Sequence, residues 1–129
     1  MSSVLRRRKT QQAELIALGR QFADRARAAL GPVTVWVYGS VARGDFNVWS
    51  DVDVLLVAAR LPADPLERWG LLIRLAPPDV EPKGYTEAEF RKILQNRKVQ
   101  VLAMLRSRIL LVDDLQLEAQ LSKETEAPS

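Results

Sequence analysis

The segment Asp51-Val52-Asp53-Val54-Leu55-Leu56-Val57 constrains the fold more than any other part of the chain. Alternate side chains of a strand point to opposite faces, so beyond the two aspartates both faces are apolar. A strand of this kind is typical of the centre of a sheet, because both of its faces must be covered. We therefore expect a central strand that opens to solvent only at Asp51 and Asp53, which share one face.

A second strand is predicted at Val33–Tyr38, which is β-branched and aromatic and follows Gly31-Pro32. Gly39 stands at its end, where a glycine allows the backbone to approach a ligand closely. From Ser40 onward a short helix can begin, with free N–H groups that point toward an anion. The Ser40 hydroxyl can add a donor, so this turn is a candidate phosphate-binding site.

The two aspartates are candidate metal ligands. Two carboxylates about 4 Å apart repel each other by roughly 4 kcal/mol at the effective dielectric usual near a protein surface. A divalent cation removes this penalty, and hard oxygen ligands on a rigid strand suit Mg²⁺, which commonly binds one or two carboxylates together with substrate phosphates.

Two competing motifs are excluded by their residues. Gly39 and Gly44 have the glycine spacing of a Walker A loop, but Asp45-Phe46 stands where lysine and serine or threonine are required. An EF-hand that began at Asp51 would need glycine at Leu56 and glutamate at Pro62.

Gly39-Ser40, ten intervening residues and then Asp51-Val52-Asp53 resemble the signature of the polymerase-beta-type nucleotidyltransferases. Ala42-Arg43-Gly44 and Ser50-Asp51 resemble the small bacterial and archaeal members called minimal nucleotidyltransferases. The resemblance implies an α+β fold (α/β sandwich), in which helices flank a mixed β-sheet. It also implies Mg²⁺ at the paired aspartates, a nucleoside triphosphate held through Gly39 and Ser40, and transfer of a nucleoside monophosphate to an acceptor hydroxyl.

This family carries a third carboxylate on the next strand, which corresponds here to residues 79–85. Glu81 is the predicted third metal ligand and a base for the acceptor hydroxyl, and Asp79, which has the same parity, is the alternative. Pro82 confines this strand to a sheet edge or a bulge, because proline cannot donate a ladder hydrogen bond. Arg43 is either a phosphate ligand or a solvated surface residue.

Minimal nucleotidyltransferases are commonly antitoxins paired with HEPN-domain ribonuclease toxins, and some transfer AMP from ATP to a tyrosine of the toxin. The resemblance thus implies ATP as donor, a HEPN-domain partner and a protein hydroxyl as acceptor. The alternative is a non-catalytic module of the same fold that binds nucleotide or a partner. An enzyme acting on a small molecule is a third possibility, although it needs a pocket that this length hardly supplies.

The length of 129 residues predicts one domain, residues 1–121 with a core at about 10–113, and a polar, disordered tail at 122–129. We expect no second domain for acceptor selection, so the acceptor is presented by another protein or by a second subunit. The chain has no cysteine and no histidine. Carboxylates are therefore the plausible bases near neutral pH.

The net charge is +3, but Arg6-Arg7-Arg8-Lys9 alone contribute four positive charges, so the rest of the chain carries a net charge of −1. This distribution does not predict direct nucleic-acid binding, which would require a basic stripe on the folded surface. The cluster is interpreted as the solvated start of the first helix, and contact with RNA or an acidic partner is the minority interpretation. No apolar run could span a membrane, and a cytoplasmic protein is expected.

Helical periodicity and capping signals predict the remaining elements. A first helix is expected at about 10–30. A second helix should start at Asp64-Pro65-Leu66-Glu67 and end before Pro77-Pro78. A third helix should start at the Thr86–Glu89 capping box. Val99–Leu105 is expected to be helical, and Ile109–Val112 a short buried strand.

Overall fold

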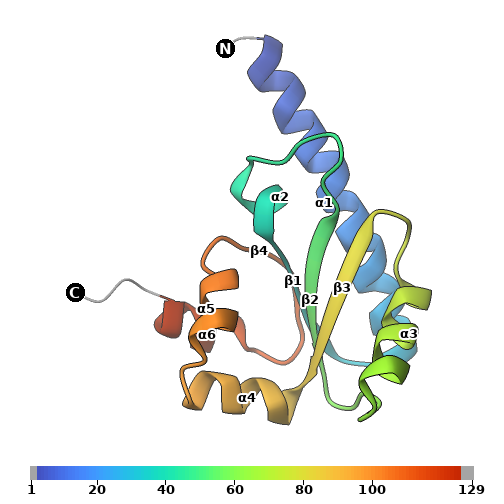
Figure 1. The fold of residues 1–129 in the computed structure, drawn as a ribbon, viewed down its shortest axis with the longest axis vertical. Helices are drawn as coiled ribbons and strands as arrows, with labels where there is room; N and C mark the ends of the chain where they lie inside the picture. Colours follow the sequence, from blue (N-terminus) through green and yellow to red (C-terminus); the bar gives the residue numbers. More distant parts are fainter. Residues whose placement is uncertain (1–2, 126–129) are drawn as a thin grey trace.

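The predicted central strand, β2 (Val52–Ala58), lies between two neighbours in the computed structural model, which describes residues 3–125. It is antiparallel to β1 (Val33–Tyr38) and parallel to β3 (Val80–Thr86). β4 (Ile109–Asp113) pairs antiparallel with the other edge of β1, which gives the order β3-β2-β1-β4. The mixed sheet expected from the sequence is therefore confirmed (Figure 1).

Two helices cover one face of this sheet, α1 (Ser3–Leu30) and α3 (Pro65–Leu75). Phe22 and Ala26 of α1 are fully buried against the valines of β1 that point to this face, and Leu72 of α3 is almost fully buried. Each valine side chain that leaves water contributes about 1.5–3 kcal/mol, so this layer is a major source of stability.

Three shorter helices cover the opposite face, α4 (Glu87–Gln95), α5 (Val99–Met104) and α6 (Glu118–Thr125). Trp36 of β1 stacks on Phe90 of α4 with 5.5 Å between the ring centroids. Leu55 and Val57 of β2 face the same core. Both faces of β2 are thus buried, as the absence of alternation in its sequence predicts.

The predicted helix starts are present. Asp64 caps α3 by accepting a hydrogen bond of 3.0 Å from the Glu67 N–H. Thr86 and Glu89 form a complete capping box at α4, because each side chain accepts a hydrogen bond from the other residue's backbone N–H. Arg68 of α3 adds an ion pair of 2.7 Å to Glu89, which ties the two helices together.

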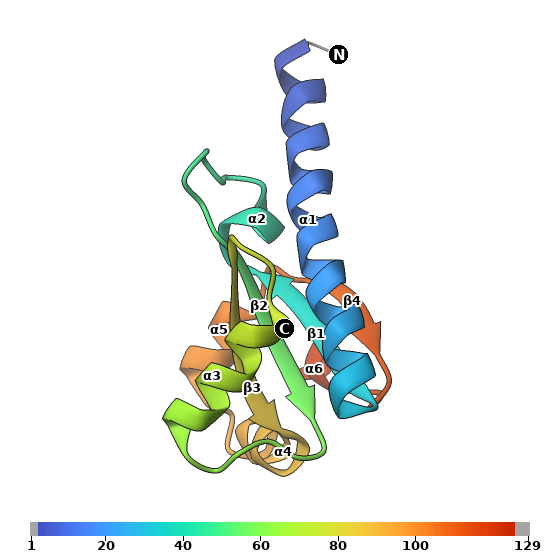
Figure 2. The same ribbon diagram turned by 90° about the vertical axis from the view of Figure 1, so that its right-hand side faces the viewer.

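The first helix begins earlier than expected, at Ser3 rather than near Thr10. Its buried residues begin only at Gly19, and the N-terminal turns project past the sheet beside α2 (Gly39–Arg43) (Figure 2). The basic cluster 6–9 lies in these exposed turns. Although α1 is 28 residues long, it is polar, and no helix within residues 3–125 is long and apolar enough to cross a membrane.

The prediction of a disordered tail is wrong for residues 122–125, which belong to α6. Arg108 explains the difference, because its guanidinium forms an ion pair of 2.7 Å with Glu118 and donates to the hydroxyls of Ser122 and Thr125. Leu121 is fully buried beneath these contacts. The rest of the predicted tail, 126–129, lies outside the described residues.

Two burial predictions also differ from the structure. β4 is an edge strand and only partly buried, with Leu110 facing solvent. In α3, Leu66 and Trp69 belong to the apolar stripe of the sequence but are largely exposed. Of this stripe, Leu72 is almost fully buried, and Ile73 and Leu75 are partly buried.

The Arg68–Glu89 ion pair predicts an acid-sensitive contribution to stability. The hydrogen bond from Arg68, followed by that from the Thr86 backbone, lowers the pKa of Glu89 below its ordinary value. A carboxylate whose pKa is lower in the folded state stabilises the fold above the unfolded pKa and loses this contribution as pH falls through the folded pKa. Glu89→Gln should therefore lower the free energy of unfolding at pH 7 and have a smaller effect near pH ~3.

Urea unfolding of the wild type and Glu89→Gln at both pH values measures this difference. Glu67→Gln is the control, because Glu67 is an exposed carboxylate on α3 that accepts no side-chain hydrogen bond from residues 3–125. An equal loss at the two pH values would contradict the assignment.

Candidate active site

The turn between β1 and α2 is built on a glycine that no other residue could replace without strain. Gly39 has a positive φ of 72°, a region that L side chains rarely adopt. A Cβ atom at this position would lie 2.5 Å from Oδ2 of Asp53. The backbone of the turn is therefore packed directly against a carboxylate of the next strand.

Strand pairing explains this approach. Tyr38, the last residue of β1, is paired with Asp53 in the antiparallel ladder, and α2 starts at the following residue. Asp53 is in turn paired with Glu81 in the parallel ladder between β2 and β3. Three neighbouring strands therefore contribute Tyr38, Asp53 and Glu81 to one end of the sheet.

The acidic residues influence one another electrostatically. Burial, followed by the carboxylates of Glu81 and Asp51, raises the pKa of Asp53 above its ordinary value, while Arg43 and Lys83 counteract part of this shift. Asp51 precedes the first residue of β2 and is exposed, whereas Asp53 is half-buried. The repulsion expected between the two aspartates is therefore present, and Glu81 adds to it.

The charge and chemistry of these residues fit a divalent cation, because a positive ion would relieve the repulsion by which Glu81 and Asp51 raise the pKa of Asp53, and carboxylates offer the oxygen ligands of Mg²⁺. The fit is one of charge and ligand type only. Within residues 3–125, no three acidic side chains lie close enough together to form a ready-made metal site.

Of the two candidates for the third carboxylate, Glu81 is the one beside Asp53. Asp79 precedes β3, has a positive φ of 70°, and accepts a hydrogen bond of 2.8 Å from the Val52 N–H through its backbone carbonyl. Pro82 follows Glu81 within β3, which is an edge strand, as a proline at this position requires.

A cavity of about 400 Å³ adjoins this cluster. One wall contains the predicted residues Gly39, Ser40, Arg43 and Asp53, and the opposite wall comes from the end of α5 and the turn after it. Sequence reasoning missed the remaining lining residues, which are Tyr38, Ala103, Met104 and Ser107. Only Tyr38 carried a local signal, because it directly precedes the glycine turn.

Two of these residues have identifiable polar environments. Burial, followed by the charges of Asp53 and Glu81, raises the pKa of Tyr38 to about 12, so its hydroxyl remains protonated and can donate a hydrogen bond. Arg43 lines the cavity and forms an exposed ion pair of 3.1 Å with Asp45. Such a pair contributes little stability, so Arg43 can exchange Asp45 for another anion.

A family model described as a nucleotidyltransferase domain matches residues 20–122, which include the glycine turn and all four strands. The chain belongs to the nucleotidyltransferase domain family. Its sheet order and flanking helices agree with the polymerase-beta type of this fold. A search of curated proteins found no match.

Two solved structures are similar to this nucleotidyltransferase domain. One is from Sulfolobus solfataricus and is described as a candidate nucleotidyltransferase, with 20% identity, a TM-score of 0.59, and coverage of 80% of this chain and 84% of that chain. The other is described as a toxin–antitoxin structure with AMP-PNP, with 18% identity, a TM-score of 0.57 and 81% coverage of both chains. At these identities the likeness concerns the fold.

The contact between Gly39 and Asp53 can be isolated with a matched glycine of this nucleotidyltransferase domain. Gly31 has a similar φ of 82°, but a Cβ there would meet nothing within 4 Å. Gly31→Ala should therefore cost only the left-handed backbone penalty of about 1–2 kcal/mol. Gly39→Ala should lower the free energy of unfolding further, because its methyl group would displace the Asp53 carboxylate.

Urea unfolding of the two variants gives this comparison. Equal losses of stability in both variants would mean that the approach of Gly39 to Asp53 adds no strain beyond the backbone penalty.

Proposed function

We propose that this nucleotidyltransferase domain uses Mg²⁺ to transfer a nucleoside monophosphate, AMP from ATP, to a hydroxyl on a partner protein. The observation that carries the proposal is the close approach of Gly39 to Asp53, which joins the candidate phosphate-binding turn to a group of carboxylates. The family match supports the general reaction class.

In this proposal, one set of residues binds the phosphates and another holds the metal ion. The backbone at Gly39, the Ser40 hydroxyl and the Arg43 guanidinium bind the β- and γ-phosphates, since all of them line one cavity. Asp51, Asp53 and Glu81 would hold Mg²⁺. When bound, the ion neutralises charge on the triphosphate and the developing charge of the displacement.

In the transfer step, the acceptor oxygen forms a bond to the α-phosphorus as the α–β bridging P–O bond breaks, and pyrophosphate leaves. The proton of the acceptor hydroxyl passes to a carboxylate, because the chain contains no histidine. Glu81 has this role in the proposal. It is exposed and lies on the edge strand, where an acceptor can approach.

The proposed partner is a HEPN-domain toxin, with this chain as its antitoxin. The resemblance to minimal nucleotidyltransferases motivates this choice, and the similar fold of a toxin–antitoxin structure with AMP-PNP, an ATP analogue, supports it. Addition of an anionic nucleotide beside a ribonuclease site would repel RNA and obstruct its access, which gives the modification a physical effect on the toxin.

Incubation of the protein with α-labelled ATP, Mg²⁺ and a HEPN-domain protein encoded beside it tests the transfer. Label should appear on the partner, and Asp53→Asn should reduce it by at least about a hundredfold. Asp24→Asn is the matched control, because it removes an exposed aspartate of α1 outside the site. Unlabelled partner, or undiminished labelling by Asp53→Asn, would contradict the proposal.

A second comparison distinguishes the two candidates for the third carboxylate. Glu81→Gln should lower the transfer rate more than Asp79→Asn, because Glu81 is the residue paired with Asp53 in the sheet. Initial rates at saturating ATP provide the measurement. A larger loss for Asp79→Asn would assign the role to Asp79 instead.

A non-catalytic module that binds a partner is the second candidate function. It is favoured by one observation, that no three acidic side chains within residues 3–125 form a ready-made metal site. Such a module would bind its partner equally well with and without Mg²⁺-ATP, which calorimetry can measure.

A further inference from the structure

The helix α2, which carries the glycine turn, has only five residues, Gly39 to Arg43. A helix of this length is unstable alone, and its last carbonyl groups have no partner within the helix. The Ser40 carbonyl accepts hydrogen bonds from the N–H groups of Gly44 and Asp45. The carbonyls that follow must find their partners elsewhere.

Two side chains from the projecting half of α1 supply these partners. Gln12 donates a hydrogen bond of 2.7 Å to the Val41 carbonyl. Arg8 donates through Nε to the Gly44 carbonyl at 3.2 Å and through Nη2 to the Phe46 carbonyl. Three carbonyls between residues 41 and 46 are therefore bound by side chains that lie 29 to 38 positions earlier in the chain.

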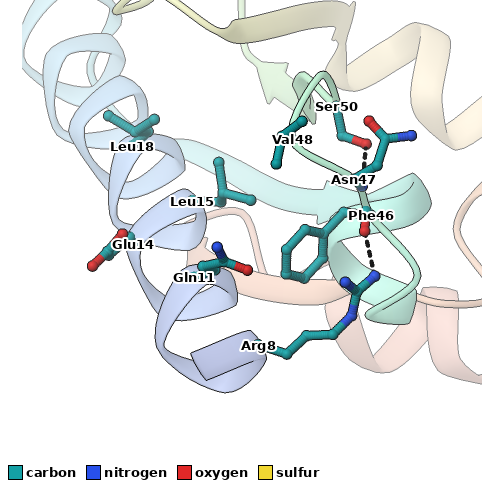
Figure 3. A pocket seen from close by; sticks show the side chains of 9 residues that line it. All are labelled: Arg8, Gln11, Glu14, Leu15, Leu18, Phe46, Asn47, Val48 and Ser50. Carbon is teal, nitrogen blue, oxygen red and sulfur yellow. Dashed lines mark hydrogen bonds between the residues drawn. The ribbon is translucent and has the colours of Figure 1, made fainter. Parts of the chain in front are cut away.

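Arg8 also holds the side chain of Phe46. Its guanidinium carbon lies 4.6 Å from the centre of the Phe46 ring, a cation–π contact. Phe46 is almost fully buried. Figure 3 shows Arg8 reaching from α1 to the loop 45–50 at one end of a cavity of about 620 Å³.

The contacts of Arg8 and Gln12 matter because a cavity lies between α1 and the middle of the loop. Leu15 and Leu18 of α1 and Val48 of the loop line it, so the middle of the loop stands away from the helix instead of packing on it (Figure 3). Val48 itself is 81% exposed. Arg8 therefore links α1 to the loop through polar contacts beside the buried Phe46 ring, and Gln12 links α1 to α2.

The same loop joins the two parts of the site. After Phe46, the backbone N–H of Asn47 donates to the Ser50 hydroxyl at 2.9 Å, and the Asn47 side chain accepts from the Trp49 N–H at 2.8 Å. This local turn leads directly into Asp51. A change in the conformation of residues 44–46 would therefore alter the position of both the glycine turn before the loop and Asp51 after it.

We infer that Arg8, assisted by Gln12, is a positioning residue for nucleotide binding. The contacts of these two side chains hold α2 and the loop 44–50 in the orientation in which Gly39 and Asp51 can contact the same nucleotide. This inference rests on the proposed function. It gives Arg8 of the basic cluster an internal role, because Arg8 faces the loop whereas the side chain of Arg7, its neighbour, makes no hydrogen bond or ion pair within residues 3–125.

Arg8→Met and Arg7→Met form the matched pair for the test, since each removes one arginine from the same exposed turn of α1. Titration with ATP, with and without Mg²⁺, should give a Kd about tenfold higher for Arg8→Met and an unchanged Kd for Arg7→Met. Arg8→Lys should recover part of the affinity, because lysine keeps the charge but not the planar fork.

Amide hydrogen exchange provides a readout that does not depend on nucleotide. Residues 40–50 should exchange faster in Arg8→Met than in Arg7→Met, while the amides of the sheet and the thermal midpoint remain unchanged. Gln12→Met should change exchange in the same direction, and it replaces Arg8→Met if that variant does not fold.

The outcomes separate the two proposals. Wild-type affinity together with wild-type exchange in Arg8→Met would overturn the positioning role. Faster exchange without any change in the Kd for ATP would also overturn it, because Arg8 would then stabilise the loop only. If the wild type does not bind ATP, the proposed function fails, and the exchange experiment alone decides whether Arg8 holds the loop.

Discussion

The site depends on the antiparallel pairing of β1 and β2, which sets the last residue of one strand opposite Asp53 near the start of the other. Because the chain turns at Gly39 immediately afterwards, its backbone approaches the aspartate to a distance that excludes any Cβ atom. The pairing is in turn fixed by burial on both faces of β2. A one-residue slip would move Asp53 into the apolar layer beneath α1 and bring Val54 to the site.

The same pairing creates an electrostatic cost that the fold tolerates. Asp51, Asp53 and Glu81 repel one another at one end of the sheet, and Arg43 and Lys83 offset only part of this. Groups with perturbed pKa values in a cavity are typical of functional sites, because selection for stability alone would remove them. The stability that offsets this cost comes from the two apolar layers, which lie away from the acidic end.

The sequence predicted those parts of the site that depend on neighbouring residues. Gly39, Ser40 and the aspartates could be proposed as site residues because a strand followed by glycine and a strand with two acids have local patterns. Glu81 was predicted ahead of Asp79, which stayed the alternative because both have the same parity, and the register with β2 sets Glu81 beside Asp53. The helices were found with displaced ends, since α6 extends to Thr125 through contacts with Arg108.

The contributions of α5 and α1 had no local signal. Met104 and Ser107 reach the cavity only because α5 belongs to the helical layer on the face of the sheet that carries Trp36 and Leu55, and periodicity does not reveal where a helix end will lie. Arg8 belonged to a cluster that was interpreted as solvated, and that interpretation holds for its exposure but misses its three contacts. Long side chains of this type carry their specificity at the tip, where sequence patterns give little information.

Pro82 has a consequence for how a partner can approach. It lies in the outermost strand next to Glu81 and contributes no N–H group to the free side of β3. An incoming extended segment would therefore find an interrupted hydrogen-bonding ladder, so this edge resists the addition of another strand. Pro82 thus favours recognition of this edge through side chains of a helix or a loop, which leaves the carboxylate edge open to chemistry instead of closing it by sheet extension.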